Sequence, residues 1–210
     1  MIPRFAFHLA DAENWPLIQR DGLLSANALI TRAGLHGNHA EPFRMYRGHS
    51  MRLPSGAWIR DQRPMAPAAL ARCLDPDLDA DAWYALVNAK VFFWLSAARL
   101  DRHRAACGAR PQIVLVLDLP ALLARHAARA CVTPFNVGNA RRRPASRGRR
   151  TFVPLASWLA TRWATEARPG AAMRSPSHPP AELTIDDAVA DLMEFVVDAR
   201  VGSQRPFAFG

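Results

Sequence analysis

The sequence predicts one α+β domain in which short strands and helices alternate without a regular repeat. Two segments, 91–95 and 112–118, have the continuous apolar and β-branched or aromatic character of buried strands. Helical patterns separate the strand segments, but no βαβ repeat follows, which argues against a doubly wound parallel sheet. We expect a single domain over residues 1–201 and a loose C-terminal tail over 202–210.

The pattern of residues 5–25 predicts a strand, then a helix, and then a return of the chain to the core. Phe5 to His8 forms a short strand, and residues 12–20 have a helical pattern. Asp11 is a suitable N-cap for this helix, and Gly22 is a suitable stop. Residues 32–58 are rich in glycine, histidine and arginine without periodicity, so we expect a long loop or lid with at most a short helix.

The remaining elements follow from similar patterns. A short extended piece is expected over 57–65, because it ends at a proline. Helices are expected over 67–74, 79–88, 96–107, 120–129 and 156–165, and strands over 91–95, 112–118, 131–135, 181–185 and 192–201. Residues 185–191 are expected to form a turn or short helix, and 168–180 a loop.

Composition narrows the class of protein. Half of the residues are hydrophobic, which is too many for a disordered chain, yet no apolar run approaches the roughly 20 residues of a membrane helix. The N-terminus lacks signal-peptide features, so we expect a cytoplasmic protein without a membrane partner. The three cysteines form no C-x-x-C pair, which argues against a disulfide framework or a metal site.

The net charge of +9 favours partners with phosphates or acidic surfaces. Lys90 is the only lysine, and an arginine-rich, lysine-poor composition also arises in GC-rich genomes without selection for binding. The phosphate-binding loop, the dinucleotide-binding glycine motif and the G-x-S-x-G nucleophile motif are all absent. His39 and Glu41 match half of a zinc-deaminase motif, but its P-C-x-x-C partner is missing.

Three short motifs, taken in order, carry the functional signal. The first places His8 at the end of a strand, before a helix and the turn that begins at Gly22. The second is the aromatic strand 91–95, and the third is 181–185, which contains Glu182. Together they resemble the DarT-like, His–aromatic–Glu branch of the ADP-ribosyltransferases, and the whole chain resembles an uncharacterised bacterial family of similar length.

That resemblance implies an ADP-ribosyltransferase-like fold of split mixed β-sheets with flanking helices, and NAD as co-substrate without a metal. It implies that His8 binds an adenosine-ribose hydroxyl of NAD and that Glu182 is catalytic, with Glu194 as the alternative glutamate. An aromatic residue would stack on nicotinamide. The candidates are Phe92, Phe93 and Trp94, and alternation along a strand puts Phe92 and Trp94 on one side.

The expected chemistry explains why a single glutamate can suffice. Breaking the nicotinamide–ribose bond creates an oxocarbenium-like ribose, which a nearby carboxylate stabilises. Nicotinamide is already a cationic leaving group, so no strong general acid is needed. Each motif also has an ordinary structural interpretation: a satisfied strand-end histidine, a core aromatic strand and a solvated glutamate.

Two further segments complete the expected site. In 59–65, Arg60 or Arg63 can clamp a pyrophosphate, and Asp61 and Gln62 can orient them. A second segment after residue 135 resembles an exposed phosphate-binding loop that would hold the acceptor. Its candidates are Asn136, Arg141, Arg142, Arg143, Arg147, Arg149 and Arg150.

The sequence thus predicts a mono-ADP-ribosyltransferase that transfers ADP-ribose from NAD to a macromolecule, with a base of DNA or RNA as the preferred acceptor. Two alternatives stay open: an NAD glycohydrolase, and a non-catalytic protein of the same fold that binds nucleic acid or nucleotide. If the protein is a toxin, an antagonist or a hydrolase partner is expected as well.

Overall fold

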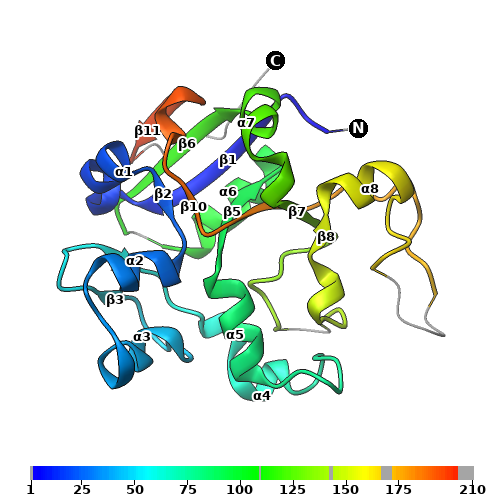
Figure 1. The fold of residues 1–210 in the computed structure, drawn as a ribbon, viewed down its shortest axis with the longest axis horizontal. Coiled ribbons are helices and arrows are strands. Elements are labelled where there is room, and N and C mark those ends of the chain that lie inside the picture. The colour runs from blue at the N-terminus through cyan, green and yellow to red at the C-terminus, as the bar shows by residue number, and fades with distance from the viewer. Residues whose placement is uncertain (1, 109, 142–143, 167–171, 203–210) are drawn as a thin grey trace.

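A seven-stranded sheet with the order β11-β6-β1-β5-β9-β7-β8 forms the centre of the computed structural model (Figure 1). The structure describes residues 2–108, 110–141, 144–166 and 172–202. The strands of this sheet are β1 (Phe5–Asp11), β5 (Lys90–Trp94), β6 (Gln112–Asp118), β7 (Ala130–Thr133), β8 (Val153–Pro154), β9 (Glu182–Asp186) and β11 (Val196–Val201). All pairs between these strands are antiparallel.

Short helices and two small sheets surround the central sheet. The α-helices are α1 (Trp15–Asp21), α2 (Ala26–Arg32), α3 (Glu41–Arg44), α4 (Pro67–Leu70), α5 (Ala80–Asn88), α6 (Ala97–Ala106), α7 (Leu119–His126) and α8 (Leu155–Thr161). The 3-10 helices are η1 (Ala12–Asn14), η2 (Gly37–His39), η3 (Arg63–Met65), η4 (Ala127–Arg129), η5 (Arg149–Thr151) and η6 (Leu192–Glu194). The small sheets pair β2 (Leu23–Leu24) with β10 (Ala188–Val189), and β3 (Met51–Arg52) with β4 (Trp58–Ile59).

The two faces of the sheet are covered by different helices. On β1, Ala6 and Ala10 belong to a core cluster that includes Ile18 of α1 and Leu119 of α7. Phe7 and Leu9, which point the other way along the strand, pack in a separate cluster with Leu100 of α6. We call these the α1/α7 face and the α6 face.

The sheet is divided into two half-sheets that meet at one point. β1 pairs with β6 along its whole length, from Phe5 to Asp11, but with β5 at a single position, Phe7 opposite Trp94. β5 in turn pairs with β9 over all five of its residues. The half-sheets β11-β6-β1 and β5-β9-β7-β8 therefore diverge beyond Phe7, and the opening between them lies beside His8.

Local sequence signals account for the longer elements. β6 is a run of apolar and mainly branched residues, and its last residue, Asp118, accepts a hydrogen bond from the backbone N–H of Ala121 to cap α7. Asp79 caps α5 in the same way through Ala82. Asp11 accepts from Glu13 at the start of η1, and Gly22 ends α1 at φ 75°.

The predicted α+β class is confirmed, and the sequence located most strands and helices of the central sheet and its flanks. Two predictions were wrong: residues 188–189 form a strand rather than part of a turn or helix, and residues 192–194 form a 3-10 helix rather than the start of the last strand. The helix α2 was not foreseen. The expected irregular segment 32–58 contains η2, α3 and β3. None of the helices in the described residues is both long and apolar enough to cross a bilayer.

Candidate functional site

A pocket of about 270 Å³ opens between the end of β1, α1, β2, α2 and β4. Its walls are mainly apolar, and several polar side chains also line it. This combination of apolar walls and a few polar side chains is typical of small-ligand sites. The aliphatic wall includes Leu17, Ile18, Leu23, Leu29 and Ala57, and the polar groups include His8, Asn14, Arg20, Asp21, Arg32 and Arg60.

His8 is one of the polar residues that line this pocket. Its Nδ1 lies 2.8 Å from the carbonyl oxygen of Phe92, and because a carbonyl can only accept, Nδ1 carries the proton. Burial lowers the pKa of His8 to about 4, with a smaller contribution from the charge of Arg60. The imidazole is therefore neutral at pH 7, and its Nε2 is an acceptor for a ligand hydroxyl.

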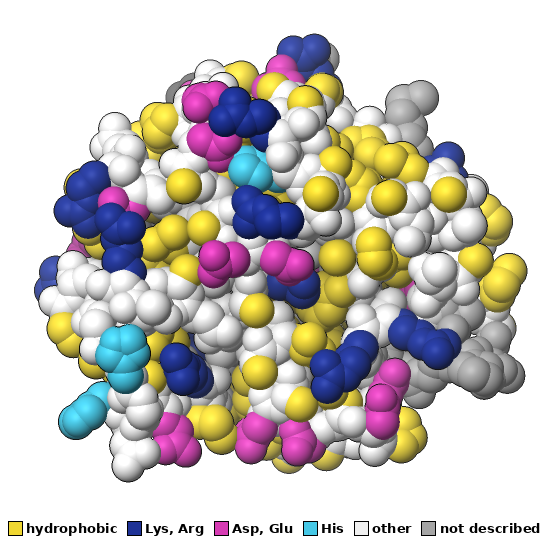
Figure 2. All heavy atoms as spheres, in the orientation of Figure 1, with side chains coloured by type: hydrophobic (Ala, Val, Ile, Leu, Met, Phe, Trp, Pro, Cys, Tyr) yellow, Lys and Arg dark blue, Asp and Glu magenta, His cyan; other side chains and the backbone are white. Residues whose placement is uncertain are grey.

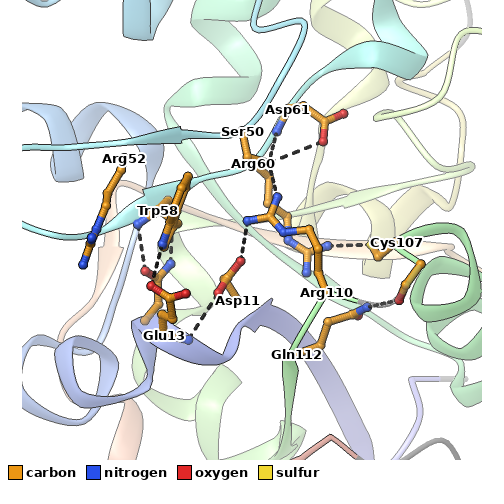
Figure 3. A network of polar contacts seen from close by, with 12 residues as sticks. Asp11, Glu13, Ser50, Arg52, Trp58, Arg60, Asp61, Cys107, Arg110 and Gln112 are labelled. Atoms are coloured by element: carbon orange, nitrogen blue, oxygen red, sulfur yellow. Dashed lines mark hydrogen bonds and ion pairs between the residues drawn. The ribbon is translucent and has the colours of Figure 1, made fainter.

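Arg60 follows β4 directly and connects the pocket with the α6 face. Besides lining the pocket, its Nη1 donates to Sγ of Cys107 at 2.9 Å (Figure 3). The same nitrogen lies 3.4 Å from Nε2 of His103. His103 Nδ1 accepts from the indole N–H of Trp94 at 3.1 Å. Burial, followed by the charge of Arg60, lowers the pKa of His103 to about 4.

The pocket wall formed by β4 is fixed to the start of α1 by Asn14. Its side chain accepts from the backbone N–H of Trp58 at 2.8 Å and donates to the carbonyl of the same residue at 2.9 Å. Arg110 contacts two of the lining residues: it donates to Asp11 at 2.6 Å, and its guanidinium lies 5.4 Å from the ring centre of Trp58 (Figure 3). These contacts hold β4, which lies far from β1 in the sequence, against the cavity beside β1.

Glu182 is the first residue of β9 and pairs with Trp94 across the strands. Its Oε2 accepts from the hydroxyl of Thr133 at 2.9 Å and from the backbone N–H of Val137 at 3.1 Å. The residue is 4 % exposed, and burial raises the pKa of its carboxyl group to about 7, although both hydrogen bonds act in the opposite direction.

The predicted residues are connected, but they do not all line one cavity. His8 and Arg60 line the pocket, whereas Glu182 and Trp94 are absent from its walls. Since Phe7 is opposite Trp94 and neighbouring residues alternate, His8 lies on the α1/α7 face, and Trp94 and Glu182 lie on the α6 face. Arg60 and His103 provide the contact between the two groups beside the opening in the sheet.

Three other predicted residues lie away from the pocket walls. Phe93 is fully buried, with its ring 5.8 Å from the His8 ring, and Phe92 packs against Phe152. Gln62 is 4 % exposed and is bonded to the backbone of Arg47 and to Asn88. Through these hydrogen bonds, Gln62 holds in place the segment that carries Arg60. The alternative glutamate, Glu194, lies in η6 and forms an ion pair with Arg125.

The arginine-rich loop contains one buried residue among exposed ones. Arg147 is 2 % exposed and donates to the carbonyl groups of Val137, Asn139 and Ala145, so it holds the loop in place rather than facing solvent. Arg141, Arg149 and Arg150 are exposed, and Asn136 and Arg141 line a second hollow of about 620 Å³. Arg142 and Arg143 lie outside the described residues.

Sequence reasoning missed Asn14 as a wall-forming residue, His103 and Cys107 as neighbours of Arg60, and Arg110 as the partner of Asp11. Asn14 stands in the first motif, but nothing near it identifies its partner 44 residues away. A family model described as a family of unknown function (DUF7002) matches residues 4–196. No curated protein matches the sequence.

Proposed function

Because the chain belongs to DUF7002, a family of unknown function, its activity has to be argued from the pocket. We propose that the protein binds NAD there and transfers ADP-ribose to a macromolecule, with a nucleic-acid base as the preferred acceptor. The observation that carries this proposal is the placement of neutral His8 and cationic Arg60 in one apolar-walled pocket beside the opening between the half-sheets.

The pocket has the groups that the adenosine diphosphate part of NAD requires. Its aliphatic wall suits the flat apolar faces of adenine. The Nε2 atom of His8 accepts a hydrogen bond from a ribose hydroxyl. Arg60 supplies a guanidinium for the diphosphate, since its planar fork matches phosphate oxygens. The volume of about 270 Å³ accommodates only part of the dinucleotide, so the nicotinamide end extends toward the opening and Trp94.

Glu182 provides the carboxylate for the chemical step in this proposal. The bond from ribose C1′ to the nicotinamide nitrogen breaks, and nicotinamide leaves with the bonding electron pair. A lone pair of the acceptor then bonds to C1′, and the acceptor's proton passes to the Glu182 carboxylate. Only the ionised form can do this. With a pKa of about 7, its fraction rises as the pH increases from 6 to 8.

One observation favours a second candidate, a protein that binds the nucleotide without turnover. Glu182 is buried and bonded to Thr133 and Val137, on the face of the sheet opposite to His8. During catalysis, Glu182 would have to break these two hydrogen bonds and form new ones with the ribose. A binding protein needs no such exchange, because His8 and Arg60 already face the pocket.

Calorimetric titration with NAD, combined with nicotinamide release in the presence of DNA, RNA or protein, separates the two candidates. His8→Ala removes an acceptor from the pocket, so we expect NAD affinity to fall by about tenfold. Glu182→Gln is expected to retain NAD affinity and to abolish nicotinamide release. Glu194→Gln is the matched control, because Glu194 is exposed, paired with Arg125 and absent from the pocket walls, and it should alter neither quantity.

The outcomes are distinct. Failure of the wild-type protein to bind NAD would contradict both candidates. Binding without nicotinamide release under any acceptor condition would leave the binding protein. Release without labelling of a polymer would show that water is the acceptor. In the transferase, release should increase with pH around a midpoint of about 7, and this dependence should disappear in Glu182→Gln.

A further inference from the structure

His103 on α6 lies beside Arg60 but is not among the residues that line the pocket. Its Nδ1 lies 3.1 Å from the indole nitrogen of Trp94, and the two rings meet edge to face with their centres 5.6 Å apart. Its Nε2 lies 3.4 Å from Nη1 of Arg60. The imidazole thus stands between Trp94 of the central sheet and Arg60 of the pocket.

The partners of His103 determine which ring nitrogen holds the proton. An indole N–H can only donate, so Nδ1 of His103 accepts from Trp94 and has no proton of its own. Burial, followed by the charge of Arg60, lowers the pKa of His103 to about 4, so the ring is neutral at pH 7 and has a single N–H. That N–H is at Nε2, the nitrogen nearest Arg60.

Arg60 and His103 therefore face each other with two donors. A guanidinium has no acceptor, so their 3.4 Å contact is not a hydrogen bond. Nη1 of Arg60 has two N–H groups and uses one of them on Sγ of Cys107 (Figure 3). In the part of the chain that the structure describes, no acceptor lies against the Nε2–H of His103. Two donors 3.4 Å apart can each lie about 2.9 Å from one oxygen atom, so a single oxygen can accept from both.

We propose that Arg60 and His103 form a two-donor site for a phosphate oxygen of the NAD diphosphate, at the opening between the half-sheets. This inference rests on the proposed function, because it concerns the ligand that enters the same pocket. Diphosphate oxygens only accept hydrogen bonds and are negatively charged, which suits one cationic and one neutral donor. His103 is then a binding residue. Trp94 is a positioning residue, because its indole keeps the proton of His103 on Nε2.

His8 has the opposite arrangement of donor and acceptor. Its Nδ1 donates to the carbonyl of Phe92, which leaves Nε2 as an acceptor. A ribose hydroxyl can donate to that nitrogen, whereas a phosphate oxygen would meet its lone pair. The two histidines therefore distinguish the ribose of the ligand from its diphosphate, and they direct the dinucleotide from the pocket toward Trp94.

Asp61 is a carboxylate close enough to act on His103, where it opposes the lowering of the pKa. Its Oδ1 accepts from the guanidinium of Arg63 at 3.1 Å, which balances its charge. Arg60, by contrast, donates to a thiol rather than to a carboxylate. The positive charge of Arg60 is therefore available to an anionic ligand.

Two substitutions at His103 separate its donor from its contact with Trp94. The side chain of His103→Asn retains an oxygen that can accept from Trp94, but its amide N–H cannot reach the position of Nε2. His103→Gln is longer and can place an amide N–H close to that position. In calorimetric titrations with ADP, we expect about tenfold weaker binding for His103→Asn and less than about threefold weaker binding for His103→Gln.

Adenosine is the matched control ligand, because it lacks phosphate, and both variants should bind it like the wild-type protein. His39→Ala is the matched control variant, since His39 is exposed and absent from the pocket walls, and it should bind ADP normally. If the wild-type protein binds NAD and His103→Asn keeps its affinity for ADP, the inference is overturned and the proposed function stands. Equal losses for ADP and adenosine would also overturn it. A wild-type protein that binds neither NAD nor ADP would overturn both.

Nitrogen-15 NMR of the imidazole rings tests the tautomers directly. We expect His103 to be protonated at Nε2 and His8 at Nδ1, with the spectra of His103→Asn and His8→Ala assigning the signals. Addition of ADP should shift the Nε2 resonance of His103, because its N–H gains an oxygen acceptor. A His103 ring protonated at Nδ1, or one whose resonance does not respond to ADP, would contradict the two-donor site.

Trp94→Phe tests the positioning role of the indole. Without that donor, Nδ1 of His103 can take the proton and Nε2 can accept from Arg60, so the same spectra should show the second tautomer. The affinity for ADP, which has no nicotinamide to stack, should fall toward that of His103→Asn. An unchanged tautomer and unchanged ADP affinity in Trp94→Phe would show that Trp94 does not position His103.

Discussion

Two buried imidazoles lie near Arg60, and both have a pKa lowered to about 4. His8 and His103 are therefore neutral over the whole range in which histidine ordinarily titrates. Neutral rings beside a guanidinium avoid the repulsion that imidazolium ions would cause. The guanidinium of Arg60 thus remains the charged group beside these rings in the pocket lining, which suits an anionic ligand group.

These groups make the stability of the protein depend on pH in opposite directions. Each histidine loses its proton on folding, so the free energy of unfolding falls as the pH drops from 6.5 toward 4. Glu182 is protonated in the fold and ionised in the unfolded chain between pH 4.5 and about 7. Its stabilising contribution is therefore present below pH 4.5 and is lost as the pH rises through 7.

We expect Glu182→Gln to gain stability relative to the wild-type protein as the pH rises from 5 to 8. The amide resembles the protonated carboxyl group and never ionises, so the difference should reach the order of 2 kcal/mol. Urea unfolding of both proteins at several pH values measures it. Glu194→Gln, at an exposed position, should show no such trend. A pH-independent difference for Glu182→Gln would mean that Glu182 is not a buried carboxyl group with a raised pKa.

At the scale of elements, the β2–β10 sheet closes the pocket behind α1. Gly22 joins α1 to β2 at φ 75°, and a Cβ atom there would lie 2.1 Å from the carbonyl oxygen of Val189 in β10. The backbone conformation and the close approach both require glycine at this position. Leu23, the next residue, is part of the pocket wall.

Gly22→Ala should destabilise the protein by about 2–4 kcal/mol and weaken ligand binding, because β10 must move away from β2. Gly34→Ala is a matched control, since Gly34 has φ 73° but no atom within 4 Å of the added Cβ. That variant should show only the conformational cost, about 1 kcal/mol. Thermal or urea unfolding compares the two. Equal losses of stability in the two variants would show that the close approach to Val189 does not contribute to the effect of Gly22→Ala.

The elements that the sequence predicted are those whose identity depends on local pattern. β1, β5, β6 and β9 are recognisable from apolar runs, and α5 and α7 from caps and turns. β10 is two residues long and exists because Leu23 and Leu24 lie beside it. β4 is likewise held by Asn14, a partner that no local pattern reveals.

The residues of the candidate site also fall into two groups: those that a local sequence pattern identified, and those whose surroundings depend on distant parts of the chain. His8 was identifiable from the first motif and Arg60 from a short charged motif, and both line the pocket. The prediction that His8 ends its strand was wrong, because pairing with β6 extends β1 to Asp11. The depth of Glu182 was not predictable, because it depends on Thr133 and Val137 from another strand and loop. Arg147 was indistinguishable in sequence from its exposed neighbours until the carbonyl groups around it were located.

At the scale of the whole molecule, the chain has a net charge of +9. Figure 2 shows lysine and arginine side chains interspersed with carboxylates on the face that it views. The exposed arginines 141, 149 and 150 lie on the loop and 3-10 helix near the second hollow. This arrangement favours contacts with phosphates through individual arginines.

Binding to a labelled oligonucleotide should therefore weaken as salt increases, and Arg149→Gln should reduce the slope of log affinity against log salt by about 1. Arg4→Gln is the control, since Arg4 is exposed but paired with Asp118 on another part of the surface. Fluorescence anisotropy at several salt concentrations gives both slopes. A slope that is equal in the wild-type protein and Arg149→Gln would exclude this arginine from the phosphate contacts.

The position of β9 in the sheet order has a consequence for biosynthesis. β9 lies between β5 and β7, so both of these strands keep an open edge until residues 182–186 have left the ribosome. β6 likewise acquires its outer neighbour, β11, last. The half-sheet that contains Trp94 is therefore completed only after residues 182–186 have been synthesised, later than the pairing of β1 with β6. The strand that carries Glu182 thus joins a scaffold already begun by β1 and β6.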